Sequence, residues 1–400
     1  MGRRVAIVGA GLTPCRARHY DRNLWDLAQM GTAAAVHDAG IHIQDVKAAV
    51  VGMYNDIFAC QAIPECGFTG HIGMANKPVL RVSTGGATGM YALDTAHGMV
   101  SSGDHDVVLC LGVEKATDPY DFQAKSPTPQ VVQTIAYSWD PWFERPENAH
   151  AADSYNQVGL AYKDEHPNDL DDEIQGRIIE LMSKQAWDNP FAQRHETVTL
   201  QDYLNSRMIV YPSRELGICV YTEGASGIIL AADGVAQEIC KQNGTEPIWV
   251  VGRGFANEPY FPGVDIRKHK ILHRIYSDYL AAKQAYEMAG VGPQDIEIFE
   301  LHDAFVFQLM ITMVECGFVQ PGHANDVLEL MLAGKPFVNL SGGLTFGGHF
   351  VGGSNMMSLW SVIREMRKRG LKFGMTHGTG ASLAQYGGVW IVEQGERRAA

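Results

Sequence analysis

Apolar positions along the chain form short runs of strand length, separated by longer stretches with helical spacing. Residues 4–8, 106–113 and 247–251 are such runs, rich in valine, leucine and isoleucine, and each predicts a buried β-strand. Residues 356–369 carry an amphipathic pattern and predict a helix. This mixture of strands and helices is typical of an α/β fold.

An internal repeat organises the chain. Residues 33–45 and 283–295 both read as a helix that ends at a glycine, Gly40 or Gly290, followed by a short turn, an aspartate and a strand. Glycine is the usual residue after a helix because it adopts the left-handed conformation without strain. A strand also precedes each helix, so the pattern predicts two similar α/β halves, residues 1–245 and 246–400. Chance recurrence of a common motif is the alternative.

The first half is longer because residues about 115–215 interrupt it. This stretch contains several prolines and aromatic residues, including Pro127 and Pro129, and then a polar helical sequence over residues 169–184. A buried strand pattern resumes at residues 222–232. We therefore expect an inserted loop subdomain that lies over a site.

Composition narrows the possible functions. The 400 residues are 46% apolar and 19% charged, as in ordinary globular proteins. No apolar run approaches the roughly 20 residues that span a bilayer, and the N-terminus lacks a signal-peptide pattern, so we expect a cytoplasmic protein without membrane association. The net charge of -13 opposes nucleic-acid binding. A basic stretch at residues 267–270 is a candidate patch for an anionic ligand.

The seven cysteines are odd in number, scattered and never spaced as C-x-x-C, which argues against both a disulfide framework and a metal site of the zinc type. Residues 8–14 contain two glycines after a strand, but the third glycine of a dinucleotide-binding loop is missing. We interpret this stretch as a turn that leaves an edge of the sheet.

Three further glycine-rich segments are candidates for a site. Residues 83–93 lead small side chains into a helix that reaches about Ser101, so the amides near Gly86 would favour negative charge, although close helix packing would also use small residues. Residues 339–353 place six glycines around His349. Residues 376–381 predict a glycine turn between two strands, whose amides could form half of an oxyanion hole.

The sequence His-Asp-Ala-Phe at residues 302–305 ends one predicted strand and opens a helix to about Gly317. A single histidine at a strand end is more often structural than catalytic. Asp303 suits the N-cap region of the helix that follows. The two histidines and three glycine segments all fall at the ends of elements, which is consistent with one shared cleft.

In this order, these pieces resemble the thiolase superfamily, in particular its sterol carrier protein type branch. The resemblance covers nearly the whole chain, and its other markers are residues 112–115, 189–192 and 223–226. It implies a five-layer αβαβα fold of two similar halves, a homodimeric core, and coenzyme A entering beneath the loop subdomain as co-substrate. It implies no metal and no other cofactor.

The resemblance also implies a set of site residues. His302 and His349 would line an oxyanion hole for the thioester oxygen, and the amides of Gly86 and Gly380 would form a second hole. The neighbours expected to contact acyl-CoA are Gly85, Asp303, Phe305, Gly348, Phe350 and Gly378.

The chain departs from the family at the nucleophile. Gly86 stands where thiolases keep their reactive cysteine, Ala304 stands where the sterol carrier type often has another, and the last glycine loop has none. Covalent acyl-enzyme chemistry needs a thiolate that faces the site. We expect Cys219 and Cys316 to be packing residues. The missing side chain at Gly86, beside Gly85, predicts extra space for a bulky acyl group such as an aromatic one.

Three functions remain open. In the first, which we favour, coenzyme A itself attacks a 3-oxoacyl carbon and His349 or His302 takes its proton. The second is a retro-aldol lyase acting on a bulky 3-hydroxyacyl-CoA, similar to thiolase-like steroid aldolases, which have glycine at the same position but tyrosines in place of the two histidines. The third is a non-catalytic subunit. Two-component members of this branch bind a small zinc-ribbon/OB-fold subunit, so we expect such a partner here.

Overall fold

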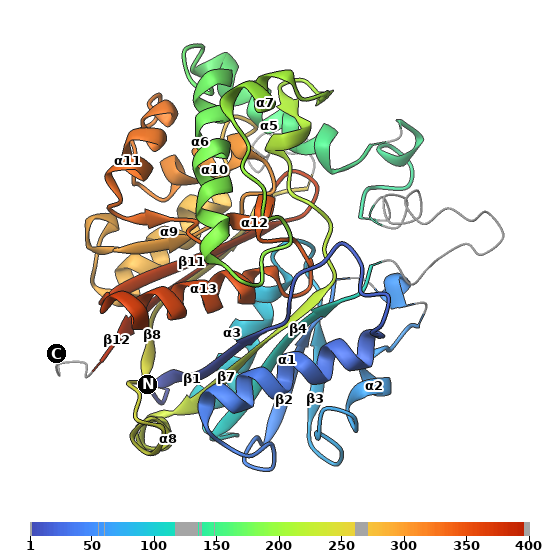
Figure 1. The fold of residues 1–400 in the computed structure, drawn as a ribbon, viewed down its shortest axis with the longest axis vertical. Helices are drawn as coiled ribbons and strands as arrows, with labels where there is room; N and C mark the ends of the chain where they lie inside the picture. Colours follow the sequence, from blue (N-terminus) through green and yellow to red (C-terminus); the bar gives the residue numbers. More distant parts are fainter. Residues whose placement is uncertain are drawn as a thin grey trace.

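The computed structural model describes residues 2–54, 56–59, 61–116, 135, 138–147, 149–260 and 271–395. Among these residues, ten strands form one mixed sheet with helices on both faces (Figure 1). The strands of this sheet are β1 (Val5–Leu12), β2 (Ala48–Gly52), β3 (Val79–Val82), β4 (Val107–Glu114), β7 (Gly224–Ala232), β8 (Ile248–Asn257), β9 (Ile298–Glu300), β10 (Phe337–Val338), β11 (Phe373–Gly380) and β12 (Tyr386–Gln394). A separate hairpin consists of β5 (Met208–Val210) and β6 (Ser213–Arg214).

The order of the strands shows the internal repeat. The first half reads β3-β2-β4-β7-β1 from edge to centre, and the second half reads β10-β9-β11-β12-β8. In each half three strands are parallel, and the strand that follows them in the sheet pairs antiparallel on both sides. The halves join where β1 pairs antiparallel with β8. The chain passes from one half to the other between α8 (Asp233–Asn243) and β8.

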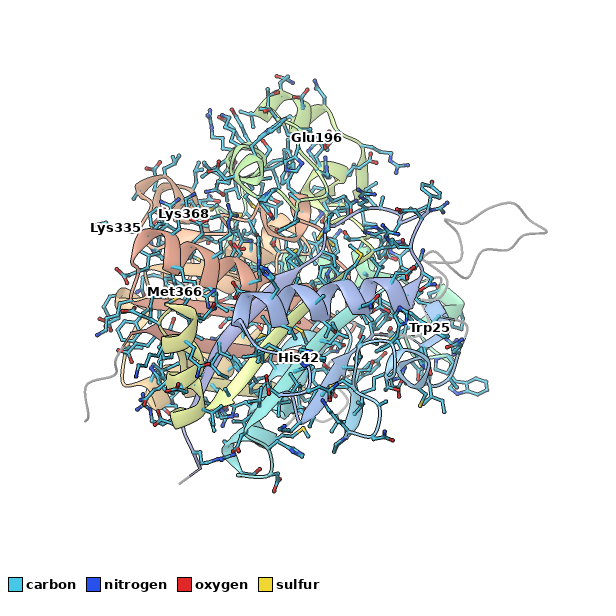
Figure 2. The ribbon with its side chains drawn as sticks, turned by 60° about the horizontal axis from the view of Figure 1, so that its bottom comes forward. Trp25, His42, Glu196, Lys335, Met366 and Lys368 are labelled. Atoms are coloured by element: carbon cyan, nitrogen blue, oxygen red, sulfur yellow. The ribbon has the colours of Figure 1, made fainter. Side chains whose placement is uncertain are left out.

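The structure has five layers, because the two halves of the sheet lie on either side of a central layer of helices and each half is covered by helices on its outer face. The helices α3 (Thr88–Ser101) and α13 (Ser354–Arg369) contact each other between the halves, α3 against β2 and β4, and α13 against β9 and β11. The outer face of the first half carries α1 (Leu24–Ala39), which lies across the strands with Trp25 near its start (Figure 2). The outer face of the second half carries α9 (Tyr276–Ala289). The predicted αβαβα fold is confirmed.

Successive apolar side chains along each strand pack on opposite faces of the sheet and so belong to different hydrophobic clusters. In β4, Leu109 and Leu111 belong to the cluster beneath α1, whereas Val108 and Cys110 belong to the cluster around α3 and α13. This follows from the period of two in a β-strand, which directs successive side chains to opposite faces. Both faces are buried, so the strands read as continuous apolar runs.

The helix ends behave as the repeat predicts. Both α1 and α9 end at a glycine with a left-handed backbone, Gly40 at φ 65° and Gly290 at φ 70°. The start of α1 is fixed by a capping box in which the Asn23 side chain accepts from the Asp26 amide and the Asp26 carboxylate accepts from the Asn23 amide.

The interpretation of residues 8–14 as a turn at a sheet edge is wrong. Gly9 and Gly11 lie inside β1, which pairs with β7 on one side and with β8 on the other. A Cβ built on Gly9 would lie 2.5 Å from the carbonyl oxygen of Ala35, and one on Gly11 would lie 2.3 Å from the Ala35 amide nitrogen. These glycines let α1 approach the strand, which is a packing requirement rather than a turn.

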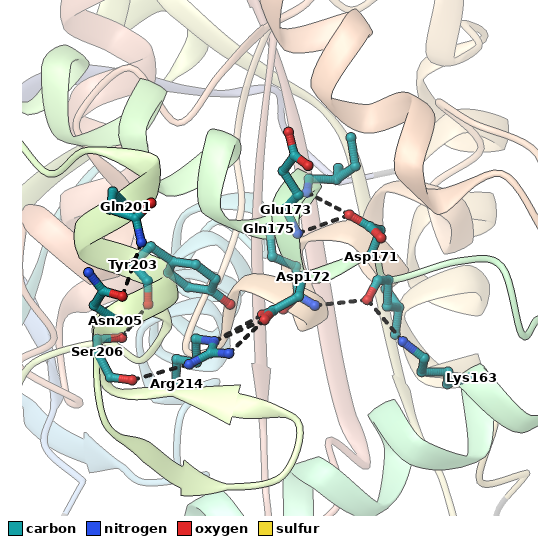
Figure 3. Close-up of polar contacts among 12 residues, drawn as sticks. Lys163, Asp171, Asp172, Glu173, Gln175, Gln201, Tyr203, Asn205, Ser206 and Arg214 are labelled. Atoms are coloured by element: carbon teal, nitrogen blue, oxygen red, sulfur yellow. Dashed lines mark hydrogen bonds and ion pairs between the residues drawn. The ribbon is translucent and has the colours of Figure 1, made fainter.

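The inserted subdomain is largely helical and contains α5 (Ala151–Glu165), α6 (Asp172–Gln185) and α7 (Leu200–Asn205). Arg214 ties it together by donating from Nε and Nη2 to the Asp172 carboxylate, and from Nη1 to the carbonyl of Ser206 (Figure 3). Both α5 and α6 contact α10 (Val306–Glu315) of the second half, although the insertion belongs to the first. Pro127, Pro129 and the basic stretch 267–270 lie outside the described residues.

The remaining helices are short: α2 (Glu65–Phe68), α11 (Val327–Ala333) and α12 (Gly343–Phe346). In the part of the chain that the structure describes, no helix has the length and apolar character needed to cross a membrane.

Candidate active site

Four residues that the sequence singles out come together at one place. The rings of His302 and His349 have centroids 5.0 Å apart and stand nearly perpendicular, at 87°. A Cβ built on Gly86 would lie 3.1 Å from His302 Cε1, and one built on Gly380 would lie 2.8 Å from the Gly86 amide nitrogen. Four segments therefore meet at this place: the start of α3, the end of β9, the end of β11 and the glycine-rich loop.

His302 is held with its Nε2 side toward Gly86. The Asn355 side chain accepts from the Met90 amide through Oδ1, at 3.3 Å, which orients its Nδ2 toward His302 Nδ1 at 3.4 Å. Because an amide nitrogen only donates, Nδ1 accepts and the ring proton resides on Nε2. A Cβ on Gly86 would lie 3.3 Å from this Nε2. His302 therefore presents an N–H donor to the space beside Gly86.

His349 is fixed by both its backbone and its ring. Its amide donates to the carbonyl of Val220 at 3.2 Å and to Thr222 Oγ1 at 2.7 Å, and its Nδ1 lies 3.0 Å from Ser354 Oγ. Burial lowers the pKa of His349 to about 4. Burial, followed by the nearby imidazoles of His349 and His377, holds the pKa of His302 well below its usual range. Both rings are neutral at pH 7, so each can donate one hydrogen bond or accept a proton.

The expected extra space at Gly86 is absent, and that prediction is wrong. A Cβ at this position would lie 2.5 Å from the carbonyl oxygen of Thr379, closer than Cβ atoms come to backbone oxygens. Gly85 adds no room for a side chain either, since it has φ 64° and a Cβ on it would lie 3.3 Å from the Ala381 amide. The absence of cysteine is compensated by close approach of the end of β11 to the start of α3.

The last glycine segment is also placed differently from the prediction. Gly378 and Gly380 lie in β11, and the turn follows them at residues 381–385. A Cβ on Gly378 would lie 2.5 Å from Asn355 Nδ2, and one on Gly380 would lie 2.6 Å from the Ala87 amide. These glycines bring β11 against the starts of α13 and α3. The amide of Gly86 lies beside Gly380, and the second oxyanion hole stays a prediction.

Asp303 does not cap the helix that follows it. The residue before α10 is Phe305, whereas the Asp303 carboxylate accepts from the amides of Leu344 and Thr345, from Thr345 Oγ1 and from Asn339 Nδ2. It therefore holds the start of α12, in the loop that carries His349. Burial raises the pKa of this carboxyl to about 7 despite these donors. Its oxygens are engaged with the loop and not with an open site.

Three other predicted contact residues are packing positions. Phe350 is fully buried in a cluster with Leu344 and Met357. Phe305 is buried against Tyr155, with ring centroids 5.3 Å apart. Gly348 has φ 123°, and a Cβ on it would lie 2.6 Å from Thr222 Oγ1. These residues shape the loops around the two histidines.

Two residues that contact His302, Asn355 and His377, were not predicted from the sequence as site residues. Asn355 lies two residues after the glycine-rich loop, in the first turn of α13. His377 accepts the His302 amide hydrogen at Nδ1, at 3.3 Å, and its Nε2 lies 2.9 Å from Asp278 Oδ1 in α9, with both side chains fully buried. A polar residue next to six glycines was an available signal for Asn355. No pattern along the chain links residue 377 to residue 278.

A buried ion pair joins two of the sequence markers. Lys115, after β4, lies 3.1 Å from the Glu223 carboxylate, and the two side chains keep 7% and 0% exposure. The same carboxylate accepts from the amide of His19 at 2.7 Å. Such a pair needs both partners, because removing one leaves a buried charge. It fixes the entry to β7 against the end of β4.

The described cysteines offer no thiolate at Gly86. The backbone of Cys219 is bound to the segment after β9, since its amide donates to the carbonyl of Ala304 at 2.9 Å. Burial raises the pKa of its thiol to about 12, so it is protonated at neutral pH. Cys316 is also buried, and burial raises its pKa well above the usual range. Among the described residues, no three His, Cys, Asp or Glu side chains converge as metal ligands.

Comparison with known proteins agrees with the observed fold. The family described as "Thiolase, N-terminal domain" matches residues 5–144, and "Thiolase C-terminal domain-like" matches residues 275–394. The chain belongs to the thiolase superfamily. The two matches fall in the first and second halves, and together they contain Gly86, His302, His349 and Gly380.

Curated relatives of this thiolase-family chain include an acetyl-CoA acetyltransferase of Methanothermobacter thermautotrophicus, 28% identical with 96% of this chain and 98% of the relative covered. Sterol carrier protein 2 of Bos taurus is 27% identical, with 94% and 70% covered. A benzoylsuccinyl-CoA thiolase subunit of Thauera aromatica is 25% identical, with 92% and 90% covered. The chain is thus a thiolase-family enzyme of the sterol carrier protein type branch that acts on coenzyme A thioesters.

Among solved structures, the Ltp2-ChsH2(DUF35) aldolase superposes with a TM-score of 0.80 at 22% identity, covering 98% of each chain. At that identity the likeness concerns the fold alone. It shows that the same fold extends over nearly the whole length of this chain.

Proposed function

We propose that this thiolase-family chain cleaves 3-oxoacyl-CoA thioesters by direct attack of coenzyme A, without an acyl-cysteine intermediate. The observation that carries the proposal is the combination of a closed position at Gly86 with two neutral imidazoles beside it. Residue 86 has no room for a nucleophilic side chain, whereas groups that polarise a carbonyl and accept a proton are present beside it.

Each group has a role in this reaction. The Nε2–H of His302 and the amide of Gly86 donate to oxygens on which negative charge develops, and such donors act most strongly in a buried site. His349, whose Nδ1 is occupied by Ser354, takes the thiol proton of coenzyme A as sulfur attacks C3. The bond between C2 and C3 then breaks, and C2 receives a proton. The products are two thioesters, and the reverse sequence forms the bond.

The substrate class is part of the proposal. The similarity to the benzoylsuccinyl-CoA thiolase subunit supports an aromatic 3-oxoacyl group. Extra space at Gly86 no longer supports it, because the structure leaves no such space. The aldolase neighbour is described as Ltp2-ChsH2(DUF35), a pair of components, and this supports a small zinc-ribbon/OB-fold partner for the present chain. A homodimeric core and a cytoplasmic location belong to the same proposal.

Retro-aldol cleavage is the second candidate. A neutral His349 could equally remove the proton of a 3-hydroxyl group, and no protein nucleophile is needed for that reaction either. The two reactions differ in their need for free coenzyme A and in the product that leaves.

The deciding experiment uses matched phenyl substrates. The purified chain, alone and with any co-encoded small zinc protein, is given 3-oxo-3-phenylpropionyl-CoA with coenzyme A, or 3-hydroxy-3-phenylpropionyl-CoA without it. We expect benzoyl-CoA and acetyl-CoA from the first and nothing from the second. Release of benzaldehyde from the second substrate without coenzyme A would replace thiolysis by the aldolase function.

Two further measurements test the mechanism. Intact-mass analysis during turnover should show no acylated protein, and an acyl adduct would contradict direct attack. His349→Gln should lower kcat by about 10²–10⁴-fold if His349 is the base. The matched control is His42→Gln, an exposed histidine beyond the end of α1 (Figure 2), and it should keep full activity.

A further inference from the structure

Residues 218–222 form a connecting segment that joins the two histidine-bearing parts of the site. At one end Ile218 forms an isolated antiparallel bridge with Phe305, three residues beyond His302. At the other end Tyr221 forms an isolated parallel bridge with His349. The segment is therefore fixed at both ends by the backbone that also positions the two imidazoles.

The parallel bridge determines where the Tyr221 side chain points. Residues paired across a parallel ladder direct their side chains to the same face, since side chains alternate in step along both segments. The His349 ring on that face lies 5.0 Å from the ring of His302. The phenol of Tyr221 therefore projects on the side where the two imidazoles meet.

Tyr221 differs from both histidines in exposure. It keeps 42% of its surface accessible, against 2% for His302 and 8% for His349. Desolvation by the surrounding protein, then the neighbouring Cys219 and Tyr54, raises the pKa of the phenol, which is therefore protonated at neutral pH. The carbonyl of Tyr54 accepts from Ser83 Oγ at 2.6 Å, on the segment that leads to Gly86.

The proposed reaction needs a proton donor at C2 as well as a base for the thiol. When the bond between C2 and C3 breaks, its electron pair stays on C2 as the enolate of a thioester, and C2 must gain a proton. The donors on His302 and Gly86 are directed at oxygen, and His349 accepts the thiol proton. Cys219 packs against a buried apolar cluster.

We propose that Tyr221 is the catalytic residue that transfers the proton to and from C2. The inference rests on the proposed function. The thiol proton of coenzyme A moves to His349 as sulfur bonds to C3, the C2–C3 bond breaks, and the phenol protonates C2. The imidazolium of His349 then returns its proton to the phenolate, so no external acid or base is consumed. In the synthetic direction neutral His349 first takes the phenolic proton, and the resulting phenolate then removes a proton from C2.

The test follows this proton without requiring carbon–carbon cleavage. The intact protein is incubated with acetyl-CoA in D2O, and loss of the methyl signal is measured by proton NMR. We expect exchange by the wild-type protein and exchange at least about 10²-fold slower by Tyr221→Phe, which keeps the ring and removes the hydroxyl. Tyr211→Phe, at a tyrosine 59% exposed in the loop subdomain, is the matched control and should exchange at the wild-type rate.

Each outcome decides the proposal. Wild-type exchange by Tyr221→Phe at saturating acetyl-CoA overturns it, even if KM has changed, because a merely positioning role would appear in KM alone. Absence of exchange by the wild-type protein also overturns it. The two proposals can also fail separately. If exchange depends on Tyr221 but the protein does not cleave 3-oxo-3-phenylpropionyl-CoA with coenzyme A, the role of Tyr221 is supported and the proposed function is refuted.

Discussion

Substitution of Gly86 by alanine tests the closed geometry of the site most directly. The added Cβ would lie 2.5 Å from the Thr379 carbonyl oxygen and 3.1 Å from His302 Cε1. Non-bonded carbon contacts are favourable near about 3.5–4.0 Å, so the end of β11 or the start of α3 must move by about 1 Å. Overpacking of this kind costs about 1–3 kcal/mol of unfolding free energy.

The same figures give the expected melting shift. Unfolding entropy of about 2.1 cal/mol/K per residue gives about 0.8 kcal/mol/K for a chain of 400 residues. The expected fall in Tm of Gly86→Ala is therefore about 1–4 °C. A displacement of about 1 Å at reacting groups costs about 10²-fold in rate, so kcat should fall by about that factor.

Gly98→Ala is the matched control, because Gly98 lies in the same helix and a Cβ there has no heavy atom within 4 Å. It should leave activity unchanged and stabilise the protein by up to about 1 kcal/mol, as glycine is the weaker helix former. The assays are thermal unfolding by circular dichroism and steady-state kinetics. If Gly86→Ala matches the wild type in both Tm and kcat, the close approach of β11 to α3 is refuted.

Three further predictions follow from the buried polar groups. Because the neutral form of His349 is the active one and its pKa is about 4, kcat/KM should stay constant from pH 8 to about 5 and fall only at more acidic pH; an acid limb centred near 6.5 would contradict this. Asn355→Ala removes the donor to His302 Nδ1 and should lower kcat by about 10–100-fold with little change in KM, whereas Ser358→Ala, one turn further along α13, should not. Asp303→Ala leaves the amides of Leu344 and Thr345 and the Asn339 side chain without their acceptor, and should lower the unfolding free energy by about 2–5 kcal/mol in urea titrations; a loss below 1 kcal/mol would show that the loop does not depend on this carboxylate.

The elements that depend on local rules could be predicted from the sequence. The helix-glycine-strand repeat identifies α1 with β2 and α9 with β9, because a left-handed glycine after a helix is a requirement of the backbone at one position. The five-layer fold, in contrast, was predicted only through the resemblance of the ordered motifs to the thiolase superfamily. The geometry of the first half then repeats in the second with the same strand order.

The reasons for individual glycines could not be predicted. Gly9, Gly11, Gly86, Gly378 and Gly380 all lack a left-handed backbone, and each is required by a neighbour from a distant part of the chain. A glycine that ends a helix and a glycine that admits another backbone are identical in sequence. Most residues of the two segments predicted as turns, 8–14 and 376–381, therefore lie in β1 and β11.

Asp303 illustrates the same limit for a polar residue. An aspartate near the start of a helix is commonly its N-cap, and α10 does begin three residues later. The carboxylate instead accepts from the loop that contains α12, forty residues further along the chain. Sequence indicates that a residue is suited to accept amide hydrogen bonds, but only the tertiary fold decides which amides are available.

The position of the Thr379 carbonyl has a consequence for engineering this site. Introducing a cysteine at residue 86 would not by itself create a thiolase nucleophile, because the sulfur-bearing carbon meets a backbone oxygen. The end of β11 would also have to move away from the start of α3, so a design needs a second change in β11 together with the cysteine.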